Sequence, residues 1–252
     1  MYLAELSSPA MAALPRSTPI VFPIAAMEQH GPHLPLYTDS LLLGEIVRRA
    51  EIQTSGQVVF APLQWLGNSD HHLDFPGTLS APPRVYLDLL VAMAENVIRH
   101  GFQRLVFLNG HGGNDVPGRQ AIFELRQSYR DRHDLLLLIA TYWHLGDPFK
   151  DAHIPFVQPH MGHACEWETS MILRLAPHLV GDNARLAAVD ATPAFHPAFR
   201  GWTARERSPT GYLGAPSAAR VEKGERLFQV FTAGTVRLLE RVREWNGSTW
   251  QE

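Results

Sequence analysis

The sequence predicts one α/β domain over residues 1–252, in which helices cover both faces of a mostly parallel sheet and form three layers with it. Apolar runs of strand length alternate with segments of helical spacing over the first 143 residues. Such alternation is typical of a parallel sheet, because each strand needs a crossover connection before the next one. The runs are apolar at nearly every position, as expected of strands buried on both faces. No repeat, low-complexity tract or linker divides the 252 residues, which fit one large domain.

The expected elements of the sheet follow one another in regular order. Strands are predicted over Ile20–Ile24, 58–63, 104–110 and 134–143. Helices are predicted over 2–14, 39–49, 83–100 and 116–130, where apolar residues recur at helical spacing. Asp39 is suited to cap the second of these helices, and Gly101 to end the third. The order is that of parallel strands joined by helices.

The remaining part of the chain is expected to contain fewer regular elements. Residues 144–165 are rich in His, Pro and Gly, which predicts a long loop over the sheet edge. A helix is predicted over 166–175. Residues 176–216 are irregular apart from a strand expected over 184–190, and a long helix over 217–244 closes the domain.

Charge and composition exclude several classes of function. The net charge of −3 provides no basic field that would attract nucleic acid or an anionic membrane surface. No apolar run approaches the ~20 residues needed to cross a bilayer, and residues 1–17 do not resemble a signal peptide. Cys165 is the only cysteine, so an internal disulfide is excluded; without an evident base partner it is expected to be a packed side chain. We expect a cytoplasmic protein without nucleic-acid or membrane partners.

Polar, chemically active side chains concentrate in residues 19–39, PIVFPIAAMEQHGPHLPLYTD. The apolar start of this stretch predicts a buried strand, and the loop that follows contains Glu28, His30 and Asp39. Charged and imidazole groups at the end of a core strand are costly to bury unless something compensates them. A metal ion is the simplest compensation, so the stretch predicts a metal site.

The loops after the other predicted strands carry further polar groups, and ligands bind outside the carboxyl ends of the strands in such sheets. These groups are Ser69, Asp70, His71, His72, Asn109, His111, His144, His160, His163, Glu166 and Glu168. Carboxylates and imidazoles with almost no sulfur favour Zn²⁺, Mn²⁺ or Fe²⁺. The set exceeds the needs of one catalytic zinc, so it favours two ions that share a bridging carboxylate and hold a hydroxide.

Five motifs resemble the creatininase (creatinine amidohydrolase) family: EQHGPHLPLYTD, FPGTLS, LNGHGGN, GHACEWETS and SPTGYLGAPSAARVEKG. Each motif alone is weak, but all five occur in the family's order, from about residue 3 to 235. The resemblance implies metal ligands at Glu28, His30, Asp39 and His111, with Asp39 as the bridge between two divalent ions. It also implies a homo-oligomer, often a hexamer.

Further roles are implied around these ligands. The resemblance implies that His163 moves a proton near the metals, and that Trp143 helps to close the substrate pocket. Ser69 and His72, in the loop after the second strand, are additional candidates for substrate binding, with loop packing as the alternative. His33 either packs in its loop or orients a ligand.

Two positions depart from creatininase itself. Gly113 stands where creatininase has a Glu, and Gly162 where it has an acidic residue before the histidine. The fifth ligand is then expected to be Glu166, the first Glu of the motif Glu-x-Glu-Thr-Ser, with Glu168 as its competitor. Residues two apart on a helix point about 200° apart, so the two side chains are not expected to bind the same metal pair. These departures indicate a branch of the family other than creatininase.

The leading hypothesis is therefore a hydrolase with two metal ions, in which a bridging hydroxide attacks the carbonyl of a small cyclic amide or a related C–N bond. The resemblance leaves open a formamide or peptide-precursor hydrolase, and a ring-opening hydrolase of a cyclic sugar-derived ketone of the inosose type. A non-catalytic metal-binding subunit is the third class. The expected partner is a small-molecule substrate.

Overall fold

The computed structural model describes residues 1–150, 154–190, 195 and 197–247. Four strands form one parallel sheet in the order β2-β1-β3-β4. They are β1 (Ile20–Ile24), β2 (Val59–Phe60), β3 (Arg104–Asn109) and β4 (Leu136–Thr141). The four predicted strands are confirmed, although β2 is much shorter than expected.

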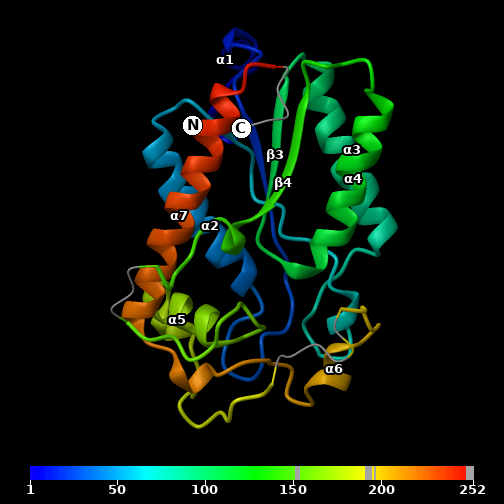
Figure 1. Ribbon diagram of the computed structural model, residues 1–252. Helices are drawn as coiled ribbons and strands as arrows, with labels where there is room; N and C mark the ends of the chain where they lie inside the picture. Colours follow the sequence, from blue (N-terminus) through cyan, green and yellow to red (C-terminus); the bar gives the residue numbers. More distant parts are fainter. Residues whose placement is uncertain (151–153, 191–194, 196, 248–252) are drawn as a thin grey trace.

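Helices cover both faces of this sheet, so the prediction of three layers is confirmed (Figure 1). One face carries α2 (Thr38–Thr54), α5 (Glu166–Leu175) and α7 (Val221–Glu244). The other face carries α3 (Pro83–Arg99) and α4 (Asp115–Ser128).

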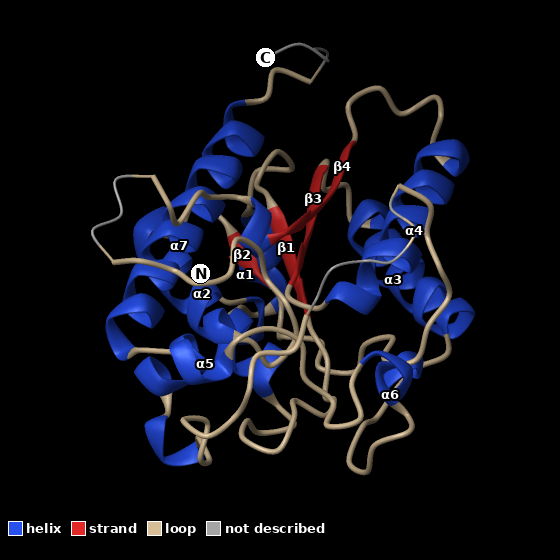
Figure 2. Cartoon of the chain, turned by 60° about the horizontal axis from the view of Figure 1, so that its bottom comes forward, coloured by secondary structure: helices blue, strands red, loops and turns tan. Residues whose placement is uncertain are grey.

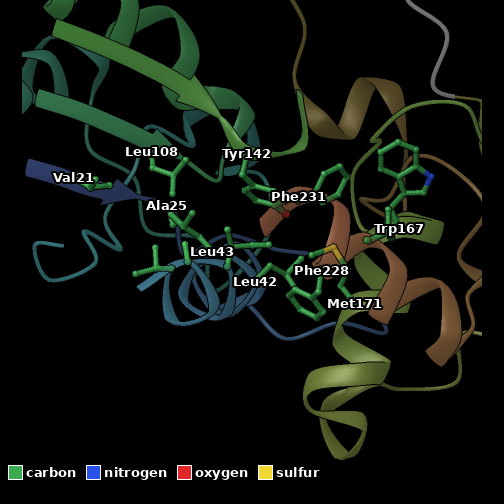
Figure 3. Close-up of a cluster of buried hydrophobic side chains, with 14 of the residues drawn as sticks. Val21, Ala25, Leu42, Leu43, Leu108, Tyr142, Trp167, Met171, Phe228 and Phe231 are labelled. Atoms are coloured by element: carbon green, nitrogen blue, oxygen red, sulfur yellow. The ribbon is translucent and has the colours of Figure 1, made fainter. Parts of the chain in front are cut away.

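Successive side chains of each strand point to opposite faces of the sheet, so the apolar core is divided into two clusters, one on each face. In β1, Val21 packs with the helices of the first face, whereas Ile20 and Phe22 pack with α3 and α4. Figure 3 shows the first cluster, in which Phe228 and Phe231 of α7 lie close to the side chains of α2 and α5. Burial of one such aromatic side chain contributes about 1.5–3 kcal/mol. The long last helix is therefore an integral part of the core.

Four expectations about the regular elements differ from the structure. The predicted helix over 2–14 is divided into a 3₁₀ turn, Leu3–Glu5, and α1 (Ser8–Ala13), because Ser7 accepts a hydrogen bond from the Ala10 amide and starts a new helix. The strand expected over 184–190 is reduced to a bridge between Val189 and Gly214.

The last helix begins at Val221, after a 3₁₀ turn over Pro216–Ala218. A short helix, α6 (Ala204–Arg207), lies within the region expected to be irregular.

The topology creates a crevice between β1 and β3. From β1 the chain crosses one face through α2 to reach β2, whereas from β3 it crosses the other face through α4 to reach β4, on the opposite side. Connections that diverge in this way leave a crevice at the carboxyl ends of the two strands. Figure 2 brings this end of the molecule forward, where many loops meet. Among the described residues, no helix is long and apolar enough to span a bilayer.

Candidate metal centre

Four of the expected ligands meet in the crevice between β1 and β3. Glu28 and His30 lie in the loop after β1, Asp39 in the first turn of α2, and His111 after β3, and all four are buried. Asp39 lies between the two imidazoles: Oδ1 is 3.1 Å from Nε2 of His30, and Oδ2 is 3.0 Å from Nδ1 of His111. Glu28 Oε1 is 3.3 Å from the same His111 atom. The two oxygens of Asp39 thus face two different histidines.

Backbone carbonyl groups fix the tautomers of these histidines. His30 Nδ1 donates to the Glu28 carbonyl oxygen at 3.1 Å, and His111 Nε2 donates to the Asn68 carbonyl oxygen at 3.0 Å. The remaining ring nitrogens, Nε2 of His30 and Nδ1 of His111, face the carboxylates. A lone pair opposite a carboxylate oxygen at this distance is repulsive unless a cation lies between them. Each pair therefore needs a proton or a metal ion.

The surroundings of two carboxylate oxygens in the cluster are further evidence for a metal site. Glu28 Oε2 is buried, and no hydrogen-bond donor among the described residues reaches it. Asp39 Oδ2 is also buried, and it faces Nδ1 of His111 at 3.0 Å, an atom that donates only when the ring is protonated there. Burial alone would raise the pKa of each carboxyl group, but the neighbouring imidazoles outweigh burial and lower it. The oxygens are therefore charged, and they require a protonated imidazole or a metal ion beside them. The donor set fits a divalent ion held by carboxylate oxygen and imidazole nitrogen.

Helix α5 contributes Glu168 to this cluster, not Glu166. Glu168 Oε1 is 3.7 Å from Nε2 of His30, and its side chain lines the cavity above the cluster. Glu166 points toward α7, where Lys223 Nζ donates to its Oε1 at 2.5 Å. The amides of Val157 and Gln158 each donate to Glu166 Oε2 at 2.9 Å. The expectation that Glu166 completes the cluster disagrees with the structure, because the helix turns the two carboxylates in different directions.

A pair of histidines lies above the cluster, held by Gln29. His163 Nε2 donates to the Gln29 carbonyl oxygen at 2.8 Å, and its Nδ1 is 3.5 Å from Glu28 Oε1. The side-chain nitrogen Nε2 of Gln29 lies 2.7 Å from His72 Nδ1, and it donates to the Gly211 carbonyl oxygen, also at 2.7 Å. Burial lowers the pKa of both His72 and His163, so both rings are neutral. Sequence reasoning missed Gln29; its position between Glu28 and His30 was the available signal.

The other predicted site residues divide into two groups. Trp143 and His72 line the cavity above the cluster, and their role in substrate binding stays a prediction. Ser69 is fully buried behind His111, with Oγ 3.2 Å from Nε2, so the expectation that it contacts the substrate disagrees with the structure. His33 is bound to the Thr169 hydroxyl at 2.9 Å and packs in the interior. Cys165 is also buried, and burial raises the pKa of its thiol to about 12.

The cavity above the cluster has a volume of about 640 Å³. Its floor contains Glu28, Asp39 and His111, and its wall includes Trp202 and Arg207 from the region around α6. Sequence reasoning missed these last two residues, because nothing in residues 176–216 indicated that this segment returns to the site.

The two glycines that depart from creatininase leave no room for side chains. A Cβ atom at Gly113 would collide with the Asn68 carbonyl oxygen and with Nε2 of His111, and one at Gly162 would collide with the Leu213 carbonyl oxygen. We therefore expect Gly113→Glu to destabilise the fold by about 2 kcal/mol or more, as overpacking does, and to add no metal ligand. Urea unfolding and metal analysis check this. Gly112→Ala, where a Cβ meets nothing within 4 Å, is the control.

Metal binding should strengthen as the pH rises. Burial would lower the pKa of His111, but the carboxylates of Glu28 and Asp39 outweigh burial and raise it to about 10 in the metal-free protein. The pKa of His30 is also raised, against burial, by Asp39 and Glu168. These protons must leave before a metal ion binds.

Below pH 10 we expect zinc affinity to increase about tenfold per pH unit for each proton displaced. Calorimetric titrations with Zn²⁺ at pH 6.5 and 7.5, in buffers of different ionisation enthalpy, measure the affinity and count the protons. A zinc affinity that does not change with pH would contradict the expectation.

Comparisons with known proteins find several similar sequences and structures. A family model described as creatininase, creatinine amidohydrolase, matches residues 4–239. A mycofactocin precursor peptide peptidase of Mycobacterium ulcerans (strain Agy99) is 32% identical, over 96% of this chain and 92% of the relative. A creatinine amidohydrolase of Pseudomonas putida is 31% identical, over 89% of this chain and 88% of the relative.

Solved structures show the same similarity. The crystal structure of a creatinine amidohydrolase superposes with a TM-score of 0.80 at 25% identity, covering 97% of this chain and 98% of the other. Two further creatininase structures, one described with Mn and one variant of the Zn–Zn type, each have a TM-score of 0.78 at 25% identity, covering 95% of this chain and 97% of the other.

Proposed function

The chain belongs to the creatininase family, and on that premise we propose that it is an amide hydrolase with a dinuclear metal centre. It is a hydrolase, and the two relatives named above, a peptide peptidase and a creatinine amidohydrolase, act on C–N bonds. The observation that carries the proposal is the position of Asp39, whose two oxygens each face a histidine with a fixed tautomer. One shared carboxylate between two such nitrogens suits a pair of ions.

The ligands divide into two sets around Asp39. We assign Glu28, Asp39 and His111 to one ion, and His30, Asp39 and Glu168 to the other. Oxygen and nitrogen donors suit Zn²⁺ or Mn²⁺, and these are the metals in the descriptions of the two related structures. When bound, such a pair polarises a carbonyl group and activates water for attack at neutral pH.

His163 is proposed to move the proton that hydrolysis requires. Its Nε2–H is held by the Gln29 carbonyl group, which leaves Nδ1 as the reactive atom, directed toward Glu28 above the cluster. A neutral ring accepts a proton at Nδ1 from the attacking water and returns it to the leaving nitrogen. His72 and Trp143 line the cavity around the substrate.

The cavity favours an amide larger than creatinine. A volume of about 640 Å³ lies in the range of sites for drug-sized ligands, whereas creatinine is a single small ring. The missing acidic side chains at Gly113 and Gly162 also point away from creatinine. We therefore favour a substituted cyclic amide, a formamide or a peptide-like substrate, whose leaving nitrogen would take the proton from His163, over the ring-opening of a ketone, in which a carbon atom would have to take it.

Metal analysis together with a substrate panel tests the proposal. We expect about two divalent ions per chain and hydrolysis of at least one lactam, formamide or peptide. His163→Asn should keep the metal and lower kcat by about 10²–10⁴-fold, as loss of general acid–base catalysis does. Fewer than about one tightly bound ion per chain, or full activity of His163→Asn, would overturn the proposal.

We extend the proposal to the assembly and the location of the protein. On the resemblance to the family, we propose a closed homo-oligomer, a hexamer, in the cytoplasm. Light scattering during size-exclusion chromatography measures the mass, and the mass of a single chain would contradict the assembly.

A further inference from the structure

A guanidinium group lines the same cavity as the metal cluster. Arg207, at the end of α6, lines this cavity together with Glu28, Asp39 and Glu168 from its floor. Among the lining residues that the structure describes, Arg207 is the one lysine or arginine. A negatively charged group that enters the cavity would therefore meet a cation on the protein's wall as well as the metal centre.

Stacked rings connect Arg207 to the metal cluster. Its guanidinium carbon lies 4.7 Å from the ring centre of Trp202. The Trp202 ring meets His71 edge-on at 4.9 Å, and His71 stacks on the proposed ligand His111 at 5.8 Å. The arginine and the proposed metal centre are thus opposite ends of one continuous wall of side chains.

The segment around α6 is fixed so that Arg207 stays on this wall. Thr203 and Glu206 cap the helix reciprocally, with the Thr203 amide donating to Glu206 Oε2 at 2.8 Å. Arg205 donates to the Asp74 carbonyl oxygen and covers the ring of Phe75, which ties α6 to the loop after β2. The two arginines of the helix therefore have different roles: Arg205 anchors the helix, and Arg207 faces the cavity.

The environment of Arg207 suits an anionic ligand. Burial lowers its pKa and the charge of nearby Asp190 raises it, and the group remains charged. A half-buried charge acts more strongly than an exposed one, because less water screens it. The planar fork of a guanidinium matches a carboxylate with two parallel hydrogen bonds, while stacking on Trp202 restricts its orientation.

We propose that Arg207 forms a subsite for a carboxylate group of the substrate, so that the enzyme acts on amides that carry a carboxylate away from the scissile C–N bond. The proposal rests on the proposed amide hydrolysis and adds the chemical class of the substrate. The amide would bind over the cluster of Glu28, Asp39 and His111, and the carboxylate would extend along the wall toward Trp202. The size of the cavity is consistent with such a substrate.

A series of small amides of increasing length tests the subsite. The probes are N-formylglycine, N-formyl-β-alanine and N-formyl-γ-aminobutyrate, each compared with its neutral carboxamide on the zinc-loaded protein. Calorimetry gives Kd, and for any probe that is hydrolysed KM and kcat are measured as well. We expect the carboxylate of best length to bind at least about tenfold more tightly than its carboxamide, as charge-assisted pairing does.

Variants of Arg207 show whether the carboxylate of a probe binds at this subsite or at the metal centre. Arg207→Met should remove the preference for the carboxylate, and Arg207→Lys should restore part of it. Arg200→Met is the matched control, because Arg200 is exposed and is not among the residues that line the cavity. A series without any preference for the carboxylate would overturn the proposal. So would a preference that survives in Arg207→Met, which is the result expected if the carboxylate bound the metal ions instead.

The same comparison on metal-free protein distinguishes the two proposals. Loss of metal removes the hydrolysis proposed above but leaves Arg207 in place, so the preference for the carboxylate should persist after treatment with EDTA. If zinc-loaded protein hydrolyses neutral amides and shows no preference for the carboxylate, only the subsite is refuted. If the protein binds no metal yet distinguishes the probes through Arg207, only the dinuclear hydrolase is refuted.

Discussion

Glu168→Gln is expected to lose one of two bound metal ions and to lower kcat by roughly 10³-fold, whereas Glu166→Gln should keep both ions. The Glu168 carboxylate lies 3.7 Å from His30 Nε2 at the edge of the cluster, while that of Glu166 is occupied by Lys223 and two backbone amides. A catalytic metal supplies several kcal/mol of transition-state stabilisation, and each 1.36 kcal/mol is a factor of ten in rate. An amide in place of the carboxylate removes the negative ligand at nearly constant volume.

Metal content measured by mass spectrometry and kcat on the best substrate of the panel check this pair of variants. The two substitutions remove the same charge from the same helix, two residues apart, so each controls for the other. Metal loss in Glu166→Gln with full occupancy in Glu168→Gln would show that Glu166 is the ligand, as the sequence motif suggested.

Lys223→Met is expected to lower the free energy of unfolding by about 3–5 kcal/mol, the usual cost of removing one partner from a buried ion pair. Glu166 is 0% exposed and Lys223 is 6% exposed, so the remaining carboxylate would be buried with only amide donors. Both groups lie outside the cluster, and we expect the metal content to be unchanged. Urea unfolding of the metal-loaded protein measures the effect.

Two further variants show whether the pair itself is responsible. Glu166→Gln combined with Lys223→Met should recover most of the lost stability, because neither charge is then buried alone. Lys150→Met removes an exposed lysine and should change the stability by less than about 0.5 kcal/mol. A loss below about 1 kcal/mol in Lys223→Met would mean that solvent reaches the pair.

Local patterns predicted most of the fold and the first half of the site. The apolar runs of β1 and β3 are buried on both faces, so their sequences differ clearly from the loops that follow. Glu28, His30 and His111 come directly after these strands, and the rule for parallel sheets is sufficient to bring them together.

The rest of the candidate site depends on contacts between residues far apart in the sequence, which no local pattern shows. Glu166 and Glu168 lie in one helical turn, and only the position of Lys223, more than 50 residues later, decides which carboxylate is already paired. Trp202 and Arg207 come from a segment without periodicity, whose path back to the cavity depends on the anchoring of α6 by Arg205. For such residues the sequence shows the chemistry but not the direction of the side chain.

The distribution of the proposed ligands along the chain has a consequence for protein synthesis. They extend from residue 28 to residue 168, and they meet only where β1, β3 and α5 are assembled. A nascent chain that has emerged only as far as the loop after β3, which carries His111, contains four of the five groups but lacks the helix that carries the fifth. On the proposed assignment, complete metal loading would therefore wait until translation has passed α5, and bound ions would from then on stabilise the finished fold by mass action.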